Sequence, residues 1–157
     1  MNFPFNFIVI PAIIIASAIV SKKYIKQGSW SWYKQLRKPK WIPSGKLIGE
    51  IWFFIYTITG LAVLWYWNVA YPGWIKYIIG AVLIVNAYYN AVRNKYFFVE
   101  NDIPKTLKIT KLLFVTTVLA TILIYIHSPI ASFLMLPYLV WVYLIMRTIK
   151  QISKLNK

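Results

Sequence analysis

Residues 32–52 of the chain read WYKQLRKPKWIPSGKLIGEIW and join a basic, aromatic loop directly to an apolar helix. The stretch contains three tryptophans, two prolines, two glycines and five basic residues. Its last part begins an apolar run from Leu47 to Trp67 in which Glu50 is the only charged residue. A run of this length can cross the roughly 30 Å of a bilayer's hydrocarbon core. The stretch therefore predicts a membrane protein whose loop covers a pocket between transmembrane helices.

The composition of the whole chain supports the membrane class. Of its 157 residues, 60% are hydrophobic and 18% aromatic, and the mean hydropathy is +0.60, all well above the average soluble domain. The net charge of +15 raises nucleic-acid binding as an alternative, but the basic residues lie in clumps between apolar runs, so we expect no nucleic-acid partner. With no cysteine and the single histidine His127, the sequence offers no thiol chemistry and no metal site.

Five apolar runs predict an all-α membrane protein, a five-transmembrane-helix bundle that forms a single domain over residues 1–157. We expect its helices at about residues 5–21, 47–67, 74–93, 107–126 and 130–150. Turns are expected at Tyr71-Pro72-Gly73 and His127-Ser128-Pro129. The first run has a signal peptide as its alternative interpretation, but its basic residues follow the run instead of preceding it, which favours a retained helix.

The distribution of basic residues predicts the orientation in the membrane. Eight Lys or Arg lie in residues 22–46, five in residues 93–111 and four from Arg147 onward, whereas the opposite side of a five-helix topology holds only Lys76. Because basic residues near span ends are retained on the cytoplasmic side, we expect the N-terminus outside, the first loop and the C-terminus in the cytoplasm, and the cytoplasmic membrane as the location. The same basic segments are expected to attract anionic lipids.

Polar and small residues in the third span are candidates for a site or a contact. Asn86 and Asn90 lie four residues apart and so share one helix face. Amides in hydrocarbon need partners, so these two bond either another helix or a ligand. Gly80, Ala87 and Ala91 form a stripe of small residues on a neighbouring face, which predicts close helix packing, either in a homodimer through the third helix or within the chain.

Aromatic residues recur at helical spacing in the second and fifth spans. The two faces consist of Ile48, Trp52 and Tyr56, and of Tyr138, Trp141 and Ile145. If both faces point inward, they wall a cavity suited to a flat apolar ligand; the alternative is that they are the core of the bundle. The sequence contains no catalytic triad, carboxylate pair or phosphate-binding glycine loop, so we expect no conventional catalytic chemistry.

These motifs resemble those of the tryptophan-rich sensory protein and translocator protein family, also called the peripheral benzodiazepine receptor family. Members typically read W-Y-x-x-L-x-K-P-x-W-x-P-P, and the chain matches this pattern from Trp32 to Pro43. It departs from the pattern at Ser44, which replaces the second proline. Asn86 and the P-Y-x-x-W sequence from Pro137 to Trp141 are further matches, and the resemblance covers most of the chain.

The resemblance implies a five-helix fold, often dimeric, whose pocket is capped by the first loop and binds porphyrins and synthetic aromatic ligands. By position it implies binding residues at Tyr33, Pro43, Ile48, Trp52, Asn86, Asn90, Tyr138 and Trp141, to which the helical faces add Tyr56 and Ile145. Ile145 stands where the family usually has alanine and narrows the implied pocket. Arg93 stands where an apolar or aromatic residue is common, and adds a cation that either meets a porphyrin propionate or reaches to the interface.

We therefore expect a tetrapyrrole sensor, carrier or regulator that binds porphyrin, heme or another flat hydrophobic ligand between its helices and requires no cofactor. Two alternatives stay open. One is a light- and oxygen-dependent porphyrin-degrading enzyme, which the resemblance implies would use Trp52 and Trp141. The other is a membrane scaffold whose aromatic faces are only core and which has no small-molecule ligand.

Overall fold

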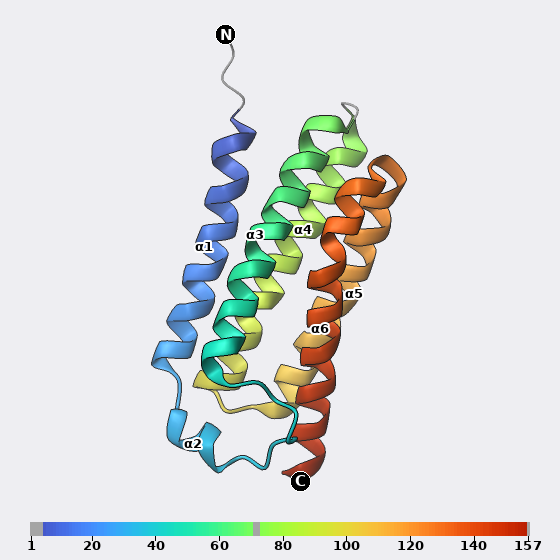
Figure 1. Cartoon of the computed structure of the whole chain (residues 1–157). Coiled ribbons are helices and arrows are strands. Elements are labelled where there is room, and N and C mark those ends of the chain that lie inside the picture. The colour runs from blue at the N-terminus through green and yellow to red at the C-terminus, as the bar shows by residue number, and fades with distance from the viewer. Residues whose placement is uncertain (1–4, 71–72, 157) are drawn as a thin grey trace.

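The computed structural model describes residues 5–70 and 73–156, and every regular element in these residues is helical. Five helices are long and apolar enough to cross a membrane: α1 (Asn6–Gln27), α3 (Gly45–Val69), α4 (Trp74–Asn94), α5 (Ile103–His127) and α6 (Pro129–Leu155). A short helix, α2 (Trp30–Gln35), lies between α1 and α3, and a π-helical segment, η1 (Lys95–Val99), continues α4. The expected all-α, five-helix membrane fold is confirmed, with the two ends of the chain at opposite ends of the bundle (Figure 1).

Several helices extend beyond the apolar runs that predicted them. α1 continues to Gln27 and α5 begins at Ile103, where the runs suggested residues 21 and 107. These extensions carry basic residues, whose long side chains can reach the membrane interface while the backbone stays helical. Between α5 and α6 the turn is the single residue Ser128, whose hydroxyl accepts a hydrogen bond from the Ala131 N–H (3.3 Å). Tyr71 and Pro72, in the other expected turn, lie outside the described residues.

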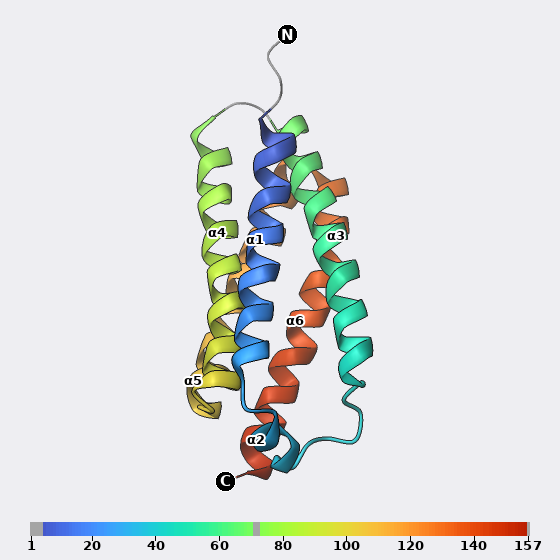
Figure 2. The ribbon, with the colours of Figure 1, turned by 90° about the vertical axis from the view of Figure 1, so that its left-hand side faces the viewer.

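The long helices form a closed ring in the order α1, α3, α6, α5, α4, in which each packs against the next. Helices α3 to α6 enclose the main core, where Tyr66, Ile79 and Met135 are completely buried. α1 lies against α3 and α4 on the outside of this core (Figure 2). Its buried residues are Ile10 and Ser21, fewer than in each of the other four long helices.

The first loop is anchored at the end of the bundle where the C-terminus lies (Figure 1). The Ser29 N–H donates a hydrogen bond to the Phe98 carbonyl of η1 (2.9 Å), and the Trp41 indole donates to Gln151 Oε1 of α6 (3.0 Å). The Arg37 N–H donates to Asn156 Oδ1 (2.9 Å) just beyond α6. The loop then enters α3 through Ser44, whose hydroxyl accepts a hydrogen bond from the Leu47 N–H (3.3 Å), as serine does at helix N-termini.

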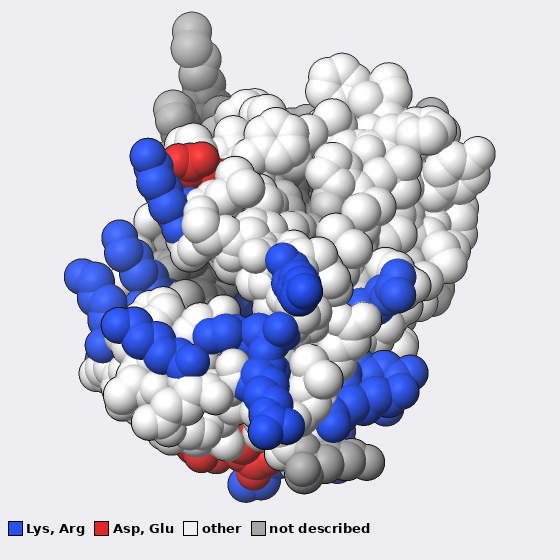
Figure 3. Space-filling view, turned by 60° about the horizontal axis from the view of Figure 1, so that its bottom comes forward, with Lys and Arg blue, Asp and Glu red and all other residues white. Residues whose placement is uncertain are grey.

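Lys and Arg side chains gather around this same end of the molecule (Figure 3). The side of the bundle that recedes toward the other end is largely free of charge in that view. The helices between the two ends expose large apolar side chains, among them Phe53 (76%) and Phe133 (64%), as expected of surfaces that face lipid.

Candidate ligand-binding site

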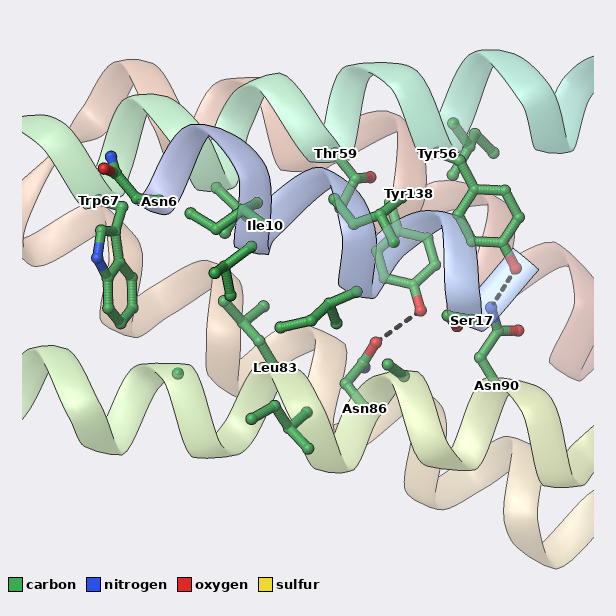
Figure 4. Close-up of a pocket in the computed structure, with 18 of the residues that line it drawn as sticks. Asn6, Ile10, Ser17, Tyr56, Thr59, Trp67, Leu83, Asn86, Asn90 and Tyr138 are labelled. Carbon is green, nitrogen blue, oxygen red and sulfur yellow. Dashed lines mark hydrogen bonds between the residues drawn. The ribbon is translucent and has the colours of Figure 1, made fainter. Parts of the chain in front are cut away.

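A cavity of about 370 Å³ lies between α1, α3 and α4, and Tyr138 of α6 reaches its inner wall (Figure 4). Most of its wall is apolar. The apolar lining residues include Ile10, Ile14, Ile55, Val63 and Leu83. At one end lie Asn6 and Trp67, and at the other Ser17, Tyr56 and Asn90. Lining residues such as Val9, Ile13 and Ile84 are also exposed, so the cavity opens to the side of the bundle beside α1.

On the inner wall of the cavity, both the amide oxygen and the amide nitrogen of Asn86 form hydrogen bonds within the protein. Its amide oxygen accepts a hydrogen bond from the Tyr138 hydroxyl (2.6 Å), and its amide nitrogen donates to Thr117 Oγ1 (2.8 Å) and Thr116 Oγ1 (2.9 Å). These bonds connect α4 to α5 and α6 and leave the Asn86 side chain 4% exposed. Of the two roles expected for the asparagine, the structure shows the interhelical one directly.

Asn90 forms a second polar group one turn further along α4. Its amide nitrogen donates a hydrogen bond to the Tyr56 hydroxyl (2.9 Å), and its amide oxygen accepts one from Arg93 Nη2 (3.3 Å). Ser17 of α1 lies at the same end of the cavity (Figure 4). This end can therefore offer hydroxyl and amide groups to a ligand whose remaining surface contacts aliphatic side chains.

Trp52 and Trp141 form an edge-to-face pair, with ring centroids 6.3 Å apart. Trp52 also stacks on Tyr56 at 5.3 Å, and both tryptophans pack against the main core. Neither lines the cavity, so they are connected to it through Tyr56. The indole N–H of Trp141 is buried and has no hydrogen-bond partner among the described residues.

Tyr33 and Ile145 belong to a separate cluster beneath the first loop, built around Phe97 and Ile149. The Tyr33 ring lies 5.9 Å from those of Phe97 and Phe98, and the Lys38 ammonium lies 4.2 Å from its centre. Burial in this cluster raises the pKa of the Tyr33 hydroxyl above its ordinary value.

The ten residues expected at the site are thus divided between neighbouring regions. Tyr56, Asn86, Asn90 and Tyr138 line the cavity. Trp52 and Trp141 lie behind it, and Tyr33 and Ile145 lie in the cluster under the loop. Pro43 and Ile48 are half-buried near the start of α3 and do not line the cavity.

Sequence reasoning missed the contribution of α1 and its N-cap residue, which together supply seven of the lining residues. They are Phe5, Asn6, Val9, Ile10, Ile13, Ile14 and Ser17. Asn6, Ile10, Ile13 and Ser17 recur at three- and four-residue spacing, and this pattern of one helix face was the signal available. The Asn6 side chain donates a hydrogen bond to Asn68 Oδ1 of α3 (2.9 Å), which holds α1 at that end of the cavity.

The stripe of small residues on α4 is used within the chain. Gly80 and Ala87 line the cavity, and Ala91 is buried. A Cβ atom on Gly80 would lie 3.4 Å from the Trp67 ring. Because these residues have no large side chains, space is left between α1 and α4. A homodimer through α4 stays a prediction. Among residues 5–70 and 73–156, no cluster of His, Cys, Asp or Glu could hold a metal ion.

The sequence profile of the TspO/MBR family matches residues 7–152. The chain is 28% identical over 119 residues to the uncharacterized membrane protein YtaB of Bacillus subtilis, covering 75% of this chain and 76% of that protein. It is 25% identical over 111 residues to the tryptophan-rich protein TspO of Bacillus cereus (71% of each) and 26% identical over 130 residues to that of Archaeoglobus fulgidus (82% of each). Because the profile covers nearly the whole five-helix bundle, the chain belongs to the TspO/MBR family.

Proposed function

We propose that the protein binds porphyrin, heme or another flat hydrophobic ligand in the cavity beside α1 and acts as a tetrapyrrole sensor, carrier or regulator. The observation that carries the proposal is the cavity itself, whose wall is mostly aliphatic and whose polar residues at one end are Tyr56, Asn90 and Ser17. Its volume of about 370 Å³ lies within the range of roughly 300–1,000 Å³ that small-molecule pockets occupy. Four of its lining residues are among those expected at the site from the sequence.

The open side of the cavity supports entry of the ligand from the bilayer. A whole porphyrin is larger than the enclosed volume, so part of its ring would lie in the opening beside α1 or α1 would move outward. The small number of buried residues on α1, Ile10 and Ser21, favours such movement. A hydrophobic ligand would reach this opening without crossing a polar surface.

The test is saturable quenching of tryptophan fluorescence when porphyrin is added to the full-length protein in nanodiscs. Ala87 lines the cavity, and Ala87→Leu adds a side chain that occupies the ligand's space. We expect this change to weaken porphyrin binding about tenfold or more. The leucine side chain would keep several apolar groups of the ligand out of the cavity, and each such group costs roughly 1 kcal/mol of binding free energy. Ala81→Leu is the matched control, since Ala81 lies on the same helix and is exposed.

Equal affinities for the two alanine variants would remove the cavity as the binding site. Replacing Trp52 and Trp141 by leucine asks a further question, because these residues lie behind the cavity. Unchanged binding in that double variant would mean that the ligand does not reach the tryptophan pair.

Light- and oxygen-dependent porphyrin breakdown is the second candidate, and one observation favours it. Trp141, Trp52 and Tyr56 form a continuous row of aromatic rings, with centroids 6.3 and 5.3 Å apart, that ends at the cavity wall. Such a row could pass an electron to a photoexcited ligand. The enzyme would yield a new product spectrum only with protein, light and oxygen present, and Trp52→Phe or Trp141→Phe would abolish it. The same product in both variants would contradict this function.

The orientation is also proposed on the basis of charge. The end of the bundle that carries α2 and the C-terminus also carries most of the basic side chains (Figure 3). We place this end in the cytoplasm and against anionic lipid headgroups.

A further inference from the structure

Arg93 is a buried cation inside the bundle. It is the second-last residue of α4, and its side chain is not extended into solvent, since the residue is 8% exposed. Basic residues near helix ends usually reach outward to the interface, as the exposed Arg147 of α6 does. A charged side chain that stays inside a membrane bundle usually marks a functional position.

The described part of the chain provides no negative side chain for Arg93. The sequence contains three acidic residues, and each lies beside lysines at the surface. Glu50 lies 4.0 Å from Lys46, Glu100 lies 3.2 Å from Lys95, and Asp102 lies 3.2 Å from Lys105. Among residues 5–70 and 73–156, Arg93 therefore has no carboxylate partner.

The groups that do contact Arg93 satisfy it only in part. Its Nη2 donates one hydrogen bond to Asn90 Oδ1 at 3.3 Å, and its guanidinium lies 5.5 Å from the centre of the Trp52 ring. Its Nε–H is buried and has no partner within the described residues. A guanidinium has five N–H donors, and leaving donors of a buried charge unpaired is costly. An anion supplied from outside the chain would remove this cost.

The position of Arg93 connects it to the cavity. Asn90 and Tyr56 line the cavity at its polar end, whereas Arg93 does not line it. Arg93 lies one contact behind the wall, since it donates a hydrogen bond to Asn90, which in turn donates one to Tyr56. The rest of the wall is built mainly from aliphatic side chains. A ligand that matched this distribution would have an apolar body and one anionic end.

We infer that Arg93 is an anion-binding residue of this cavity, and that the ligand is an amphipathic carboxylate. Its apolar body lies between α1, α3 and α4, and its carboxylate reaches past the end lined by Tyr56 and Asn90 to accept hydrogen bonds from Arg93, which lies directly behind Asn90. Guanidinium and carboxylate pair in a planar, two-pronged geometry that other cations do not reproduce. The inference rests on the proposed function, since it specifies the class of ligand that the same cavity takes.

The experiment compares charged and neutral forms of the same ligand on the full-length protein in nanodiscs of zwitterionic lipid. One pair of probes is a porphyrin dicarboxylate and its dimethyl ester. The other is a pyrene carrying a butanoate chain and the corresponding neutral amide, which separates a small aromatic acid from a tetrapyrrole. Binding is measured by quenching of tryptophan fluorescence. We expect the acid of at least one pair to bind about tenfold or more tightly than its neutral partner, the range typical of charge-assisted hydrogen bonds.

Substitution of Arg93 tests whether this preference arises in the cavity. In Arg93→Met we expect the acid and the neutral form to bind equally, whereas Arg147→Met, which removes an exposed arginine from α6 near the same end, should keep the preference. Arg93→Lys keeps the charge but lacks the planar fork and should retain part of the preference. If Arg93→Met does not fold, Arg93→Lys compared with Arg147→Met decides the inference, because only the change at Arg93 should reduce the preference for the acid.

Each outcome has a distinct meaning. Equal binding of acid and neutral forms in the unaltered protein overturns the anion site and leaves the proposed function standing. A preference that Arg93→Met and Arg147→Met reduce alike reflects the general positive charge of this end of the molecule, and also overturns the inference. If none of the four probes binds, the inference and the proposed function both fail.

Discussion

Gly28 shows how one residue without a side chain positions the first loop. A Cβ atom at this position would lie 2.5 Å from the Phe98 Cβ and 2.9 Å from the Phe98 carbonyl oxygen. The backbone of Gly28 itself is extended in a region open to any residue. Glycine is thus required for close approach of the chain to η1, and not for its backbone conformation.

Gly28→Ala is expected to destabilise the protein by about 1–3 kcal/mol, the usual cost of forcing extra atoms into a packed contact. Thermal unfolding in detergent, followed by circular dichroism, measures the effect. Gly49→Ala is the control, since a Cβ at Gly49 meets nothing within 4 Å. Because alanine favours helix over glycine by about 1 kcal/mol, this second change should be neutral or stabilising. Equal losses of stability in both variants would contradict the packing explanation.

The hydrogen bond from Tyr138 to Asn86 links α6 to α4 at a buried position. Tyr138→Phe removes the hydroxyl and leaves the Asn86 oxygen without that donor, so we expect a loss of about 1 kcal/mol in unfolding free energy. Tyr125→Phe on α5 removes a tyrosine hydroxyl from a residue that is 55% exposed, and should change stability little. If the Tyr138 hydroxyl contributed only to ligand binding, Tyr138→Phe and Tyr125→Phe would both be as stable as the unaltered protein in the absence of ligand.

At the scale of the element, α5 begins with a side-chain cap whose charge depends on pH. The Asp102 carboxylate accepts a hydrogen bond from the Lys105 backbone N–H (2.8 Å). This bond, together with the nearby Lys105 ammonium, lowers the pKa of Asp102 below its ordinary value. A lowered pKa means that the folded protein favours the ionised carboxylate.

Asp102 therefore stabilises the folded state at pH values above its unfolded pKa of about 3.9, and this contribution is lost as the pH falls through the lower folded pKa. We expect Asp102→Ala to lower the unfolding temperature at pH 7, and the difference from the unaltered protein to shrink below about pH 3.9. Asp102→Asn keeps a capping side chain without the charge and should lie between the two at pH 7. A difference that stayed constant down to about pH 2 would exclude the ionised cap as the cause.

At the scale of the whole molecule, the proposed orientation can be tested because the chain lacks cysteine. Ser31 is exposed on α2, and Gly73 is exposed at the other end of the bundle, where a Cβ atom would meet nothing within 4 Å. A membrane-impermeant maleimide added to intact cells should label Gly73→Cys and leave Ser31→Cys unlabelled. Ser31→Cys should react once the cells are opened. The reverse labelling pattern would place the basic end outside.

Much of the fold follows from local properties of the sequence. Long apolar runs predict spans because the bilayer requires every backbone group to be hydrogen-bonded within a helix, and this requirement acts on each run independently of the others. The aromatic and basic first loop also carried enough specific residues, from Trp32 to Pro43, to indicate the family. Ser44 departs from the family pattern, yet it has a clear local role as the N-cap of α3.

The composition of the site depended on packing between elements. Helical spacing showed that Trp52 and Tyr56 share a face, but not that Tyr56 would reach the cavity while Trp52 packs behind it. The spacing from Asn6 to Ser17 marked one face of α1, but it did not show that this face forms a wall of the cavity, because that depends on where α3 and α4 lie.

The sequence by itself determined the membrane class, the five helices and the family, since these depend on hydrophobicity, length and local motifs. Only the tertiary structure decided which polar groups are satisfied within the chain and which are left over. Asn86 finds all its partners on α5 and α6, whereas Arg93 is buried with an unpartnered N–H among the described residues. The physical reason is that a buried polar group is satisfied or not by atoms from distant parts of the chain, and their positions are set by the packing of the whole bundle.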